Sequence, residues 1–240
     1  MRDLIHQLQN KFAFLRARIE KKLTGDEQAL QLFRACHRHS SSQILQQTIN
    51  ETRFVVMDTE TTGLHAYSGD AIIDIALIEM QGLQITGRTF QTRINPQRAI
   101  PASSTVFHHL TDKDVADAPI LVTVLPAILD FIDNAVLVGH HISFDIRFIN
   151  KTLQKVCHGR LQNPWLDTML LYLEHRGQIG HYTLEEVARY CKVDIVNRHS
   201  ATGDAAATAA IFTHLVQLLG ASGDTIQRLI RSQFRIRARL

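Results

Sequence analysis

The sequence predicts an α/β protein: a mixed five-stranded sheet flanked by helices, with a helical extension at the N-terminus. Segments 54–60, 71–80 and 85–94 are apolar or alternate in polarity, which is typical of strands. After residue 119, short apolar segments alternate with stretches of helical periodicity. An antiparallel beginning followed by this alternation favours a mixed sheet covered by helices. The 240 residues suffice for one sizeable domain and an appendage.

Two helices are predicted ahead of the first strand. Apolar residues recur at helical spacing in the first of them, at Leu4, Leu8, Phe12, Leu15 and Ile19. Thr24 and Gly25 end this helix, and Asp26 caps a second one that runs to about Cys36. The serines at 40–42 close the extension.

The first strand, 54–60, is followed by a hairpin of the segments 71–80 and 85–94. Residues 119–133 form a helix, and Pro126 inside it predicts a kink or a break because proline lacks a backbone N–H. The remaining predicted elements, in chain order, are a short buried strand at 135–139, a helix at 143–156, a fifth extended piece ending at Leu166, and helices around 183–191, 204–219 and 223–238.

Composition excludes several classes of protein. The chain is 45% hydrophobic and 20% charged, as expected of a protein that buries a core rather than a disordered or fibrous one. No apolar run approaches the roughly 18 residues of a membrane span, and polar residues interrupt the N-terminus, so we expect neither a membrane partner nor a signal peptide. The three cysteines are far apart and lack a CxxC pair, which favours a reducing cytoplasm over disulfides or a zinc ribbon.

The charges are unevenly distributed along the chain. Residues 1–50 hold eight Lys or Arg against four Asp or Glu, and residues 221–240 hold five against one. We therefore expect a basic helical extension at 1–50, a mildly acidic domain at 51–220 and a basic C-terminal helix at 221–240. This pattern suits an anionic polymer as partner and a carboxylate-rich centre that needs cations. Basic helix faces that simply face water explain it equally well.

Asp58 and Glu60 are two residues apart at the end of the first strand, so their side chains lie on the same face. Two like charges about 4–5 Å apart repel by roughly 3–4 kcal/mol at an effective dielectric constant of 20. A cation between them, Mg²⁺ or Mn²⁺, relieves this repulsion, since hard oxygen ligands suit those ions. The alternative is a solvated strand end. The residues that follow, Thr61–Leu64, add hydroxyls, a glycine for close backbone approach and an apolar residue.

Two later segments repeat this chemistry. In residues 138–145 a strand leads into a helix, and Asp145 falls in its first turn, where a helix-dipole role is the alternative. Asp204 opens a helix of small residues and, taken alone, is equally an N-cap. His199 lies five residues earlier in a loop, where a surface imidazole is the alternative.

The order of these motifs is specific. There are three of them: DTETTGL on the first strand, HxxxFDxxF about 80 residues later and HxAxxDA near the end. On these three motifs, the chain resembles the DEDD exonuclease superfamily, and within it the histidine-containing branch. That branch includes the epsilon proofreading subunit of bacterial DNA polymerase III, ribonuclease T and oligoribonuclease, and the first motif is most similar to the proofreading enzymes. The resemblance covers residues 51–220. Further matching segments are Asp74 within IIDIA, FHHLT at 107–111, Asp167–Thr168 and Tyr182–Leu184.

The resemblance implies a ribonuclease-H-like fold and a metal-dependent 3′→5′ exonuclease that releases 5′-mononucleotides. It implies two divalent cations, Mg²⁺ with Mn²⁺ as a substitute, held by Asp58, Glu60, Asp145 and Asp204. Asp58 would bridge both ions, Glu60 and Asp204 would complete the nucleophile side, and Asp145 would serve the other ion. His199 would be the general base, because a neutral imidazole takes a proton near neutral pH.

The resemblance also implies the substrate contacts. The partner would be the 3′ end of a nucleic acid, with single-stranded DNA favoured, and a polymerase or repair protein is a further candidate partner. The residues expected to hold the terminal nucleotide are Thr61, Thr62, Gly63, Leu64, His108, His141 and Phe144. Alternatives are an exoribonuclease of the same family and a non-catalytic nucleic-acid-binding module. The oligomeric state stays open.

Four positions carry further expectations. His141 stands where relatives commonly have Asn, and His109 stands where Gly is common, so both are expected to tune substrate contacts rather than catalyse. Asp74 shares a face with apolar strand residues and is expected to be buried and hydrogen-bonded, and Asp167 is expected to support the site or cap a helix. The arginines of the last helix are expected to hold the upstream strand or, alternatively, to face solvent: Arg228, Arg231, Arg235, Arg237 and Arg239.

Overall fold

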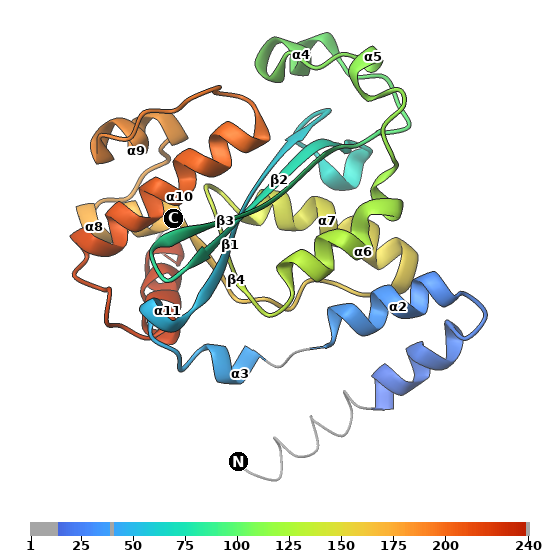
Figure 1. Ribbon diagram of the computed structural model, residues 1–240, viewed down its shortest axis with the longest axis horizontal. Coiled ribbons are helices and arrows are strands. Elements are labelled where there is room, and N and C mark those ends of the chain that lie inside the picture. Colours follow the sequence, from blue (N-terminus) through green and yellow to red (C-terminus); the bar gives the residue numbers. More distant parts are fainter. Residues whose placement is uncertain (1–13, 39–40, 239–240) are drawn as a thin grey trace.

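The computed structural model describes residues 14–38 and 41–238 and contains a five-stranded sheet in the order β3-β2-β1-β4-β5 (Figure 1). Strands β1, β2 and β3 form an antiparallel meander, and β4 and β5 continue the sheet parallel to β1. Their bounds are β1 Arg53–Thr61, β2 Ile72–Gln81, β3 Gln84–Arg93, β4 Val136–Gly139 and β5 Trp165–Asp167. The predicted mixed sheet is confirmed, including the hairpin and the short fifth strand.

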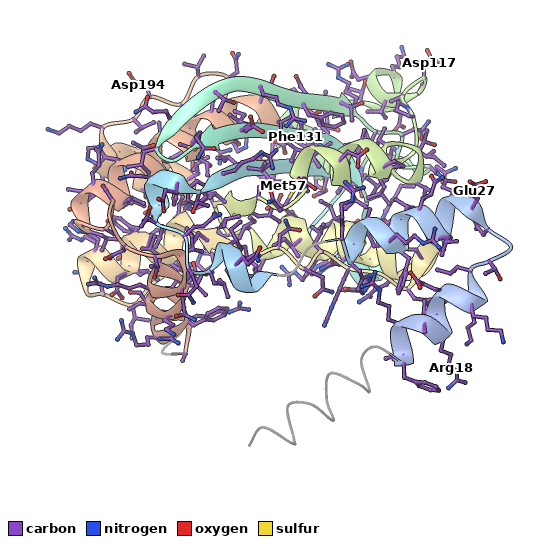
Figure 2. All side chains as sticks on the ribbon, turned by 60° about the horizontal axis from the view of Figure 1, so that its bottom comes forward. Arg18, Glu27, Met57, Asp117, Phe131 and Asp194 are labelled. Atoms are coloured by element: carbon purple, nitrogen blue, oxygen red, sulfur yellow. The ribbon has the colours of Figure 1, made fainter. Side chains whose placement is uncertain are left out.

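Alternation along β1 sends its side chains to two separate cores. Phe54 and Val56 pack on one face, whereas Val55 and Met57 pack on the other, and all four are at most 1% exposed. Met57 lies in the middle of the molecule in Figure 2. A strand that is buried on both faces has consecutive apolar residues, which explains the apolar run 54–57 in β1.

Four helices form the layer on the face of Phe54. They are α8 Thr168–Arg176, α9 Leu184–Cys191, α10 Ala201–Leu218 and α11 Ile226–Arg237. The buried alanines of α10 have small side chains, which suits close packing against the strands. Helix α8 was not among the predicted elements. Its central residues are buried around most of its circumference, so the one-sided periodicity that reveals a surface helix is absent.

Three helices cover the opposite face: α2 Glu27–Cys36, α6 Leu121–Ile132 and α7 Ser143–Cys157. The break considered at Pro126 does not occur, because α6 runs through this residue. Proline leaves the carbonyl group four residues earlier without its helical donor. That carbonyl belongs to Val122, and it accepts a hydrogen bond of 3.4 Å from Gln28 Nε2 of α2.

The described part of the N-terminal extension packs onto this second core. Residues 14–22 are helical, and the Asp26 carboxylate caps α2 by accepting from Ala29 N. Leu32 and Phe33 are at most 2% exposed and join the cluster formed with α6 and α7. The periodic residues Leu4, Leu8 and Phe12 lie outside the described residues. A short helix, α3 Ser41–Ile44, and a 3₁₀ turn, η1 Ile49–Glu51, lead into β1.

One side chain of helix α11 forms hydrogen bonds with the edge strand β5. Gln233 is fully buried; its Oε1 accepts from Asp167 N at 3.0 Å, and its Nε2 donates to Trp165 O at 2.8 Å. A side-chain amide therefore satisfies the backbone of the edge strand β5. Arg237 lies over the Trp165 ring, while Arg228 is largely exposed.

Three short elements lie in the connections after the first strands: η2 Ala66–Ser68 follows β1, and α4 Ala102–His108 and α5 Asp112–Val115 follow β3. Within residues 14–38 and 41–238, no helix combines the length and apolarity needed to cross a membrane. The division of the chain into an extension, a central domain and a basic helix stays a prediction.

Candidate active site

Three of the predicted carboxylates meet where β1 ends beside α10. Asp58 and Glu60 follow Phe54 and Val56 at period two, so they face α10, and Asp204 lies in the first turn of that helix. One oxygen of each carboxylate lies within 4.8 Å of the others. Oxygen ligands at such spacing suit a hard divalent cation.

Asp145 belongs to the other face of β1. It lies in the first turn of α7, is 4% exposed, and its Oδ1 accepts a hydrogen bond of 2.6 Å from the Thr59 hydroxyl. It is not part of the three-carboxylate group, but its charge is among the causes that raise the pKa of Asp58. The structure therefore brings three acids together and places the fourth beside them, behind the strand. Thr59, which orients it, was not predicted.

Burial makes ionisation of these acids unfavourable. It raises the pKa of Glu60 to about 7 and that of Asp204 to about 6, with the Asp204 charge adding to the effect on Glu60. Burial also raises the pKa of Asp145 to about 7 and, together with the charges of Asp145 and Asp204, raises that of Asp58 well above its usual range. A bound cation would reverse these shifts.

One carboxylate oxygen in the cluster has no hydrogen-bond partner. Asp204 Oδ1 is buried and has no hydrogen-bond donor, an arrangement that costs free energy unless a ligand meets it. Together with the crowded carboxylates, this orphaned oxygen shows that the residues present fit a divalent cation. Within the described chain, this is the one group of three or more such ligands that was found.

Arg198 enters the same cluster, and it was not predicted. Its Nη1 pairs with Asp204 Oδ2, and its Nε lies 2.6 Å from Glu185 Oε1. The guanidinium charge opposes the burial effect by lowering the pKa of Asp58, Glu60 and Asp204. In the sequence, an arginine in a loop before a histidine is indistinguishable from a surface charge.

His199 follows Arg198 in the loop before α10 and is half-buried. Its backbone has φ of 62°, and its ring meets Phe107 edge-on at a centroid distance of 5.8 Å. Burial, with the neighbouring Arg198 charge, lowers the pKa of His199, so the ring is neutral at pH 7 and able to accept a proton.

The turn after β1 presents Leu64 to solvent. The Thr61 hydroxyl donates to Gly63 O at 2.7 Å, and Thr62 is 1% exposed, whereas Leu64 is 73% exposed. A side chain at Gly63 would overlap the Asp70 carboxylate, which explains the glycine in this motif.

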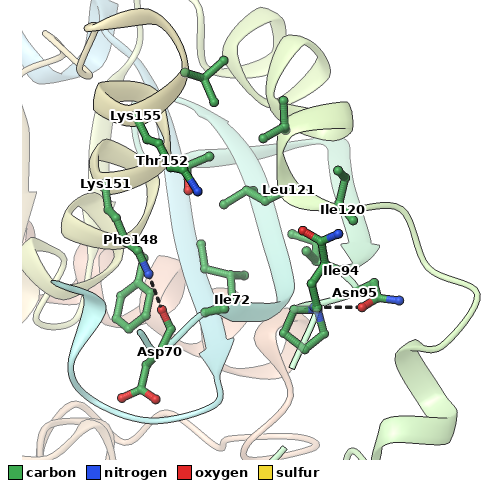
Figure 3. Close-up of a pocket in the computed structure, with 15 residues that line it drawn as sticks. Asp70, Ile72, Ile94, Asn95, Ile120, Leu121, Phe148, Lys151, Thr152 and Lys155 are labelled. Carbon is green, nitrogen blue, oxygen red and sulfur yellow. Dashed lines mark hydrogen bonds between the residues drawn. The ribbon is translucent and has the colours of Figure 1, made fainter. Parts of the chain in front are cut away.

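Asp70 fixes this turn from behind and was not predicted. Its Oδ2 accepts from His65 N at 2.9 Å, its Oδ1 pairs with Arg98 at 2.9 Å, and its carbonyl oxygen accepts from Lys151 Nζ at 2.9 Å. Behind it lies a pocket of about 200 Å³ (Figure 3). The pocket's labelled lining includes Ile72, Ile94, Ile120, Leu121 and Phe148, and none of the clustered carboxylates.

The histidines at 108, 109 and 141 differ in role. His108 is 6% exposed; its Nδ1 accepts from Leu110 N at 3.0 Å, its Nε2 has no partner, and burial lowers its pKa. His109 and His141 have φ of 59° and 57°, the left-handed conformation that glycine and asparagine adopt most readily. This conformation agrees with the expectation that Gly and Asn are common at those two positions in the resembled family.

Three further residues singled out in the sequence are buried or partly buried. Asp167 caps α8, accepting from His141 N at 3.1 Å and Met169 N at 3.0 Å, as expected of a capping group. The Phe144 ring lies 4.9 Å from Phe148 and is partly buried. Asp74 is 5% exposed as predicted, but its hydrogen bonding is weaker than expected: one oxygen has a single 3.5 Å bond and the other has none.

Comparison with known proteins gives consistent matches. A family model described as an exonuclease, RNase_T, matches residues 55–212. The DNA polymerase III subunit epsilon-like protein of Rhodobacter capsulatus is 35% identical over 206 residues, 85% of this chain but only 29% of that protein. The DNA polymerase III subunit epsilon of Rickettsia felis is 31% identical over 173 residues, 70% of this chain and 75% of that one.

Among solved structures, the nuclease domain of 3′hExo, described as a DEDDh family member bound to rAMP, matches with a TM-score of 0.63 at 16% identity. The match covers 73% of this chain and 96% of that domain. At this identity, the likeness establishes a shared fold.

Proposed function

The chain belongs to the exonuclease family whose model matches residues 55–212, and on this premise we propose that it hydrolyses the terminal phosphodiester bond at the 3′ end of a nucleic acid, releasing 5′-mononucleotides. The observation that carries the proposal is the meeting of Asp58, Glu60 and Asp204 with their nearest oxygens within 4.8 Å. A phosphodiester is anionic, so an acidic cluster approaches it only with cations bound.

Divalent cations, Mg²⁺ with Mn²⁺ as a substitute, are the proposed cofactors. Asp58, Glu60 and Asp204 would hold them, and Asp145 is close enough to contribute its charge. When bound, such ions neutralise charge on the phosphoryl group and lower the pKa of water. The unpartnered Asp204 Oδ1 supports this assignment independently of the family.

His199 is the proposed general base. Its ring is neutral at pH 7, because burial lowers its pKa, and a neutral imidazole accepts the proton of the attacking water. His199 follows Arg198, which is paired with Asp204, so the proposed base is adjacent in the chain to a residue that contacts the acidic cluster. The edge-on Phe107 ring restricts one side of the imidazole.

Leu64 and its turn are proposed to hold the terminal nucleotide. An apolar side chain that is 73% exposed suits stacking on a base, and the Asp70 contacts hold the turn in place. His108, His141 and Phe144 are proposed to complete this subsite. DNA is the favoured substrate, because the two curated relatives are named as DNA polymerase III epsilon proteins.

RNA is the second candidate substrate, since the 3′hExo domain was solved with rAMP and discrimination depends on contacts to the 2′-hydroxyl. A polymerase is the proposed partner on the strength of the relatives' names. That partnership is tested by co-purification with a polymerase subunit.

The test is degradation of oligonucleotides labelled at the 5′ end, with the released products identified by chromatography, and with single- and double-stranded DNA and RNA compared in Mg²⁺, Mn²⁺ and EDTA. We expect a ladder that shortens from the 3′ end, mononucleotide product, preference for single-stranded DNA and no reaction in EDTA. Asp58→Asn, checked for folding by circular dichroism, should be inactive. Binding without degradation by the wild-type protein would instead indicate a non-catalytic module.

A further inference from the structure

The Arg198 guanidinium occupies the acidic cluster rather than the protein surface. It bridges two acids, with Nη1 on Asp204 and Nε 2.6 Å from Glu185, and its side chain is 29% exposed. Only Asp204 of these two belongs to the three-carboxylate group. Arg198 is therefore shared between one acid of the cluster and one acid outside it.

The backbone around Arg198 is built to hold this position. Asn197 and His199 have φ of 54° and 62°, so a left-handed residue lies on each side of the arginine. Such conformations are unfavourable for side chains other than glycine and persist only where the surroundings fix them. Gly203 provides that fit, because a Cβ there would overlap the carbonyl oxygens of Val196 and Asn197. The loop is thereby packed directly onto the first turn of α10.

The two oxygens of Asp204 have different environments. Oδ1 is buried and unpartnered, whereas Oδ2 is paired with the guanidinium. A divalent cation bound by Asp58, Glu60 and Asp204 would lie within a few ångströms of the Arg198 charge. Like charges at that separation repel strongly in a partly buried site. Glu185 shares the guanidinium charge with Asp204, since it binds a different nitrogen of the same group.

We propose that Arg198 is an internal counter-ion of the metal centre: its guanidinium competes with divalent cations for Asp204, and Glu185 restrains it. This inference rests on the proposed function in so far as the cluster must bind cations. It assigns to Arg198 and Glu185 a role in setting cation affinity, which makes both of them positioning residues rather than catalytic ones.

Two substitutions should act in opposite directions. Arg198→Gln removes the competing charge, so cation affinity should rise by about tenfold. Glu185→Gln removes the restraint, so the guanidinium pairs with Asp204 alone and affinity should fall by about the same factor. In the double variant, Glu185→Gln should have much less effect, because its action depends on Arg198.

The experiment is calorimetric titration of Mn²⁺ into the chelator-treated full chain at about pH 8.5, above the pKa of about 7 of Glu60. Arg228→Gln is the matched control, since it also removes an arginine paired with an aspartate, Asp224, but far along the chain from the cluster. Its Mn²⁺ affinity should equal that of the wild type. Thermal unfolding in EDTA checks that each variant is folded.

An Arg198→Gln protein with unchanged or weaker affinity would overturn the proposal. If this variant does not fold, Arg198→Met decides: tighter Mn²⁺ binding supports the proposal, and equal or weaker binding overturns it. Failure of the wild type to bind Mn²⁺ at all would overturn the inference together with the proposed function. If the wild type binds Mn²⁺ and degrades oligonucleotides from the 3′ end, but all variants have the same Mn²⁺ affinity, then only the inference about Arg198 is overturned.

Discussion

The Thr59 hydroxyl donates a hydrogen bond of 2.6 Å to Asp145 Oδ1, and this bond joins β1 to the first turn of α7. Thr59 lies between Asp58 and Glu60 in the sequence, yet its side chain points to the opposite face of the strand. One strand thus places two acids directly and orients a third through the intervening residue. The hydrogen bond also opposes the burial that raises the pKa of Asp145.

Replacing Thr59 by valine tests this arrangement, since valine keeps the shape and removes the donor. We expect Thr59→Val to lower kcat on a labelled oligonucleotide by about 10–100-fold, the usual cost of losing a group that orients a metal ligand, which is the role predicted for Asp145. Thr59→Ser, which keeps the hydroxyl, should retain most of the activity. Equal rates for the valine variant and the wild type would show that Asp145 needs no such support.

His140 gives a prediction about acid stability. It is partly buried between Thr168 Oγ1 and Tyr182 O, each 2.9 Å away, and burial lowers its pKa to about 3. The unfolded chain, with an ordinary pKa of about 6.5, binds a proton that the folded protein does not. The stability from the neutral ring is therefore fully present above about pH 6.5 and is lost as the pH falls toward 3, by up to about 1.4 kcal/mol per pH unit.

Urea unfolding at several pH values measures this effect. His140→Asn should weaken the fall in unfolding free energy between about pH 6.5 and pH 4, whereas His158→Asn, at an exposed helix end, should leave it unchanged. Parallel curves for His140→Asn and the wild type would mean that the buried ring does not contribute to acid sensitivity.

The contacts of Gln233 indicate that the basic C-terminal helix stabilises the fold. Gln233→Leu fills a similar volume but leaves Asp167 N and Trp165 O without partners. Each unsatisfied buried group costs about 1–3 kcal/mol, so the unfolding free energy should fall by roughly 2–4 kcal/mol. Arg231→Gln, on an exposed position of the same helix, should change stability by less than about 0.5 kcal/mol. An unaffected Gln233→Leu protein would indicate that water replaces the amide.

The sequence predicted the fold and the resemblance well because both depend on local patterns. Period two along β1 is enough to place Asp58 and Glu60 on one face, and the matches to the exonuclease family confirm the relationship inferred from three motifs. Helix α8 was missed because it is buried on most sides and so lacks a one-sided pattern. A periodicity argument finds surface helices and fails for enclosed ones.

The unpredicted site residues share a different cause. They act through contacts with residues that are 5 to 86 positions away in the chain, and they are Thr59, Asp70, Glu185 and Arg198. Nothing local distinguishes Arg198 from a solvated arginine, or Asp70 from an ordinary turn residue. Their functions arise from tertiary contacts, which one sequence does not reveal. The roles proposed for His199 and the nucleotide-binding residues stay predictions.

The backbone conformation of His109 gives a prediction about stability. This residue follows α4 with φ of 59°, a conformation that costs a residue with a side chain about 1 kcal/mol relative to glycine. His109→Gly should therefore raise the unfolding free energy by about 0.5–1 kcal/mol in urea unfolding. His65→Gly, at an exposed position with negative φ, should lower the unfolding free energy instead.

The same His109→Gly variant tests a contact with substrate. A changed ratio of KM values for DNA and RNA oligonucleotides, at constant kcat, would show that the imidazole at this strained position contacts the substrate. A destabilised His109→Gly protein would contradict the strain argument, because it would mean that the side chain stabilises the fold by more than its backbone conformation costs.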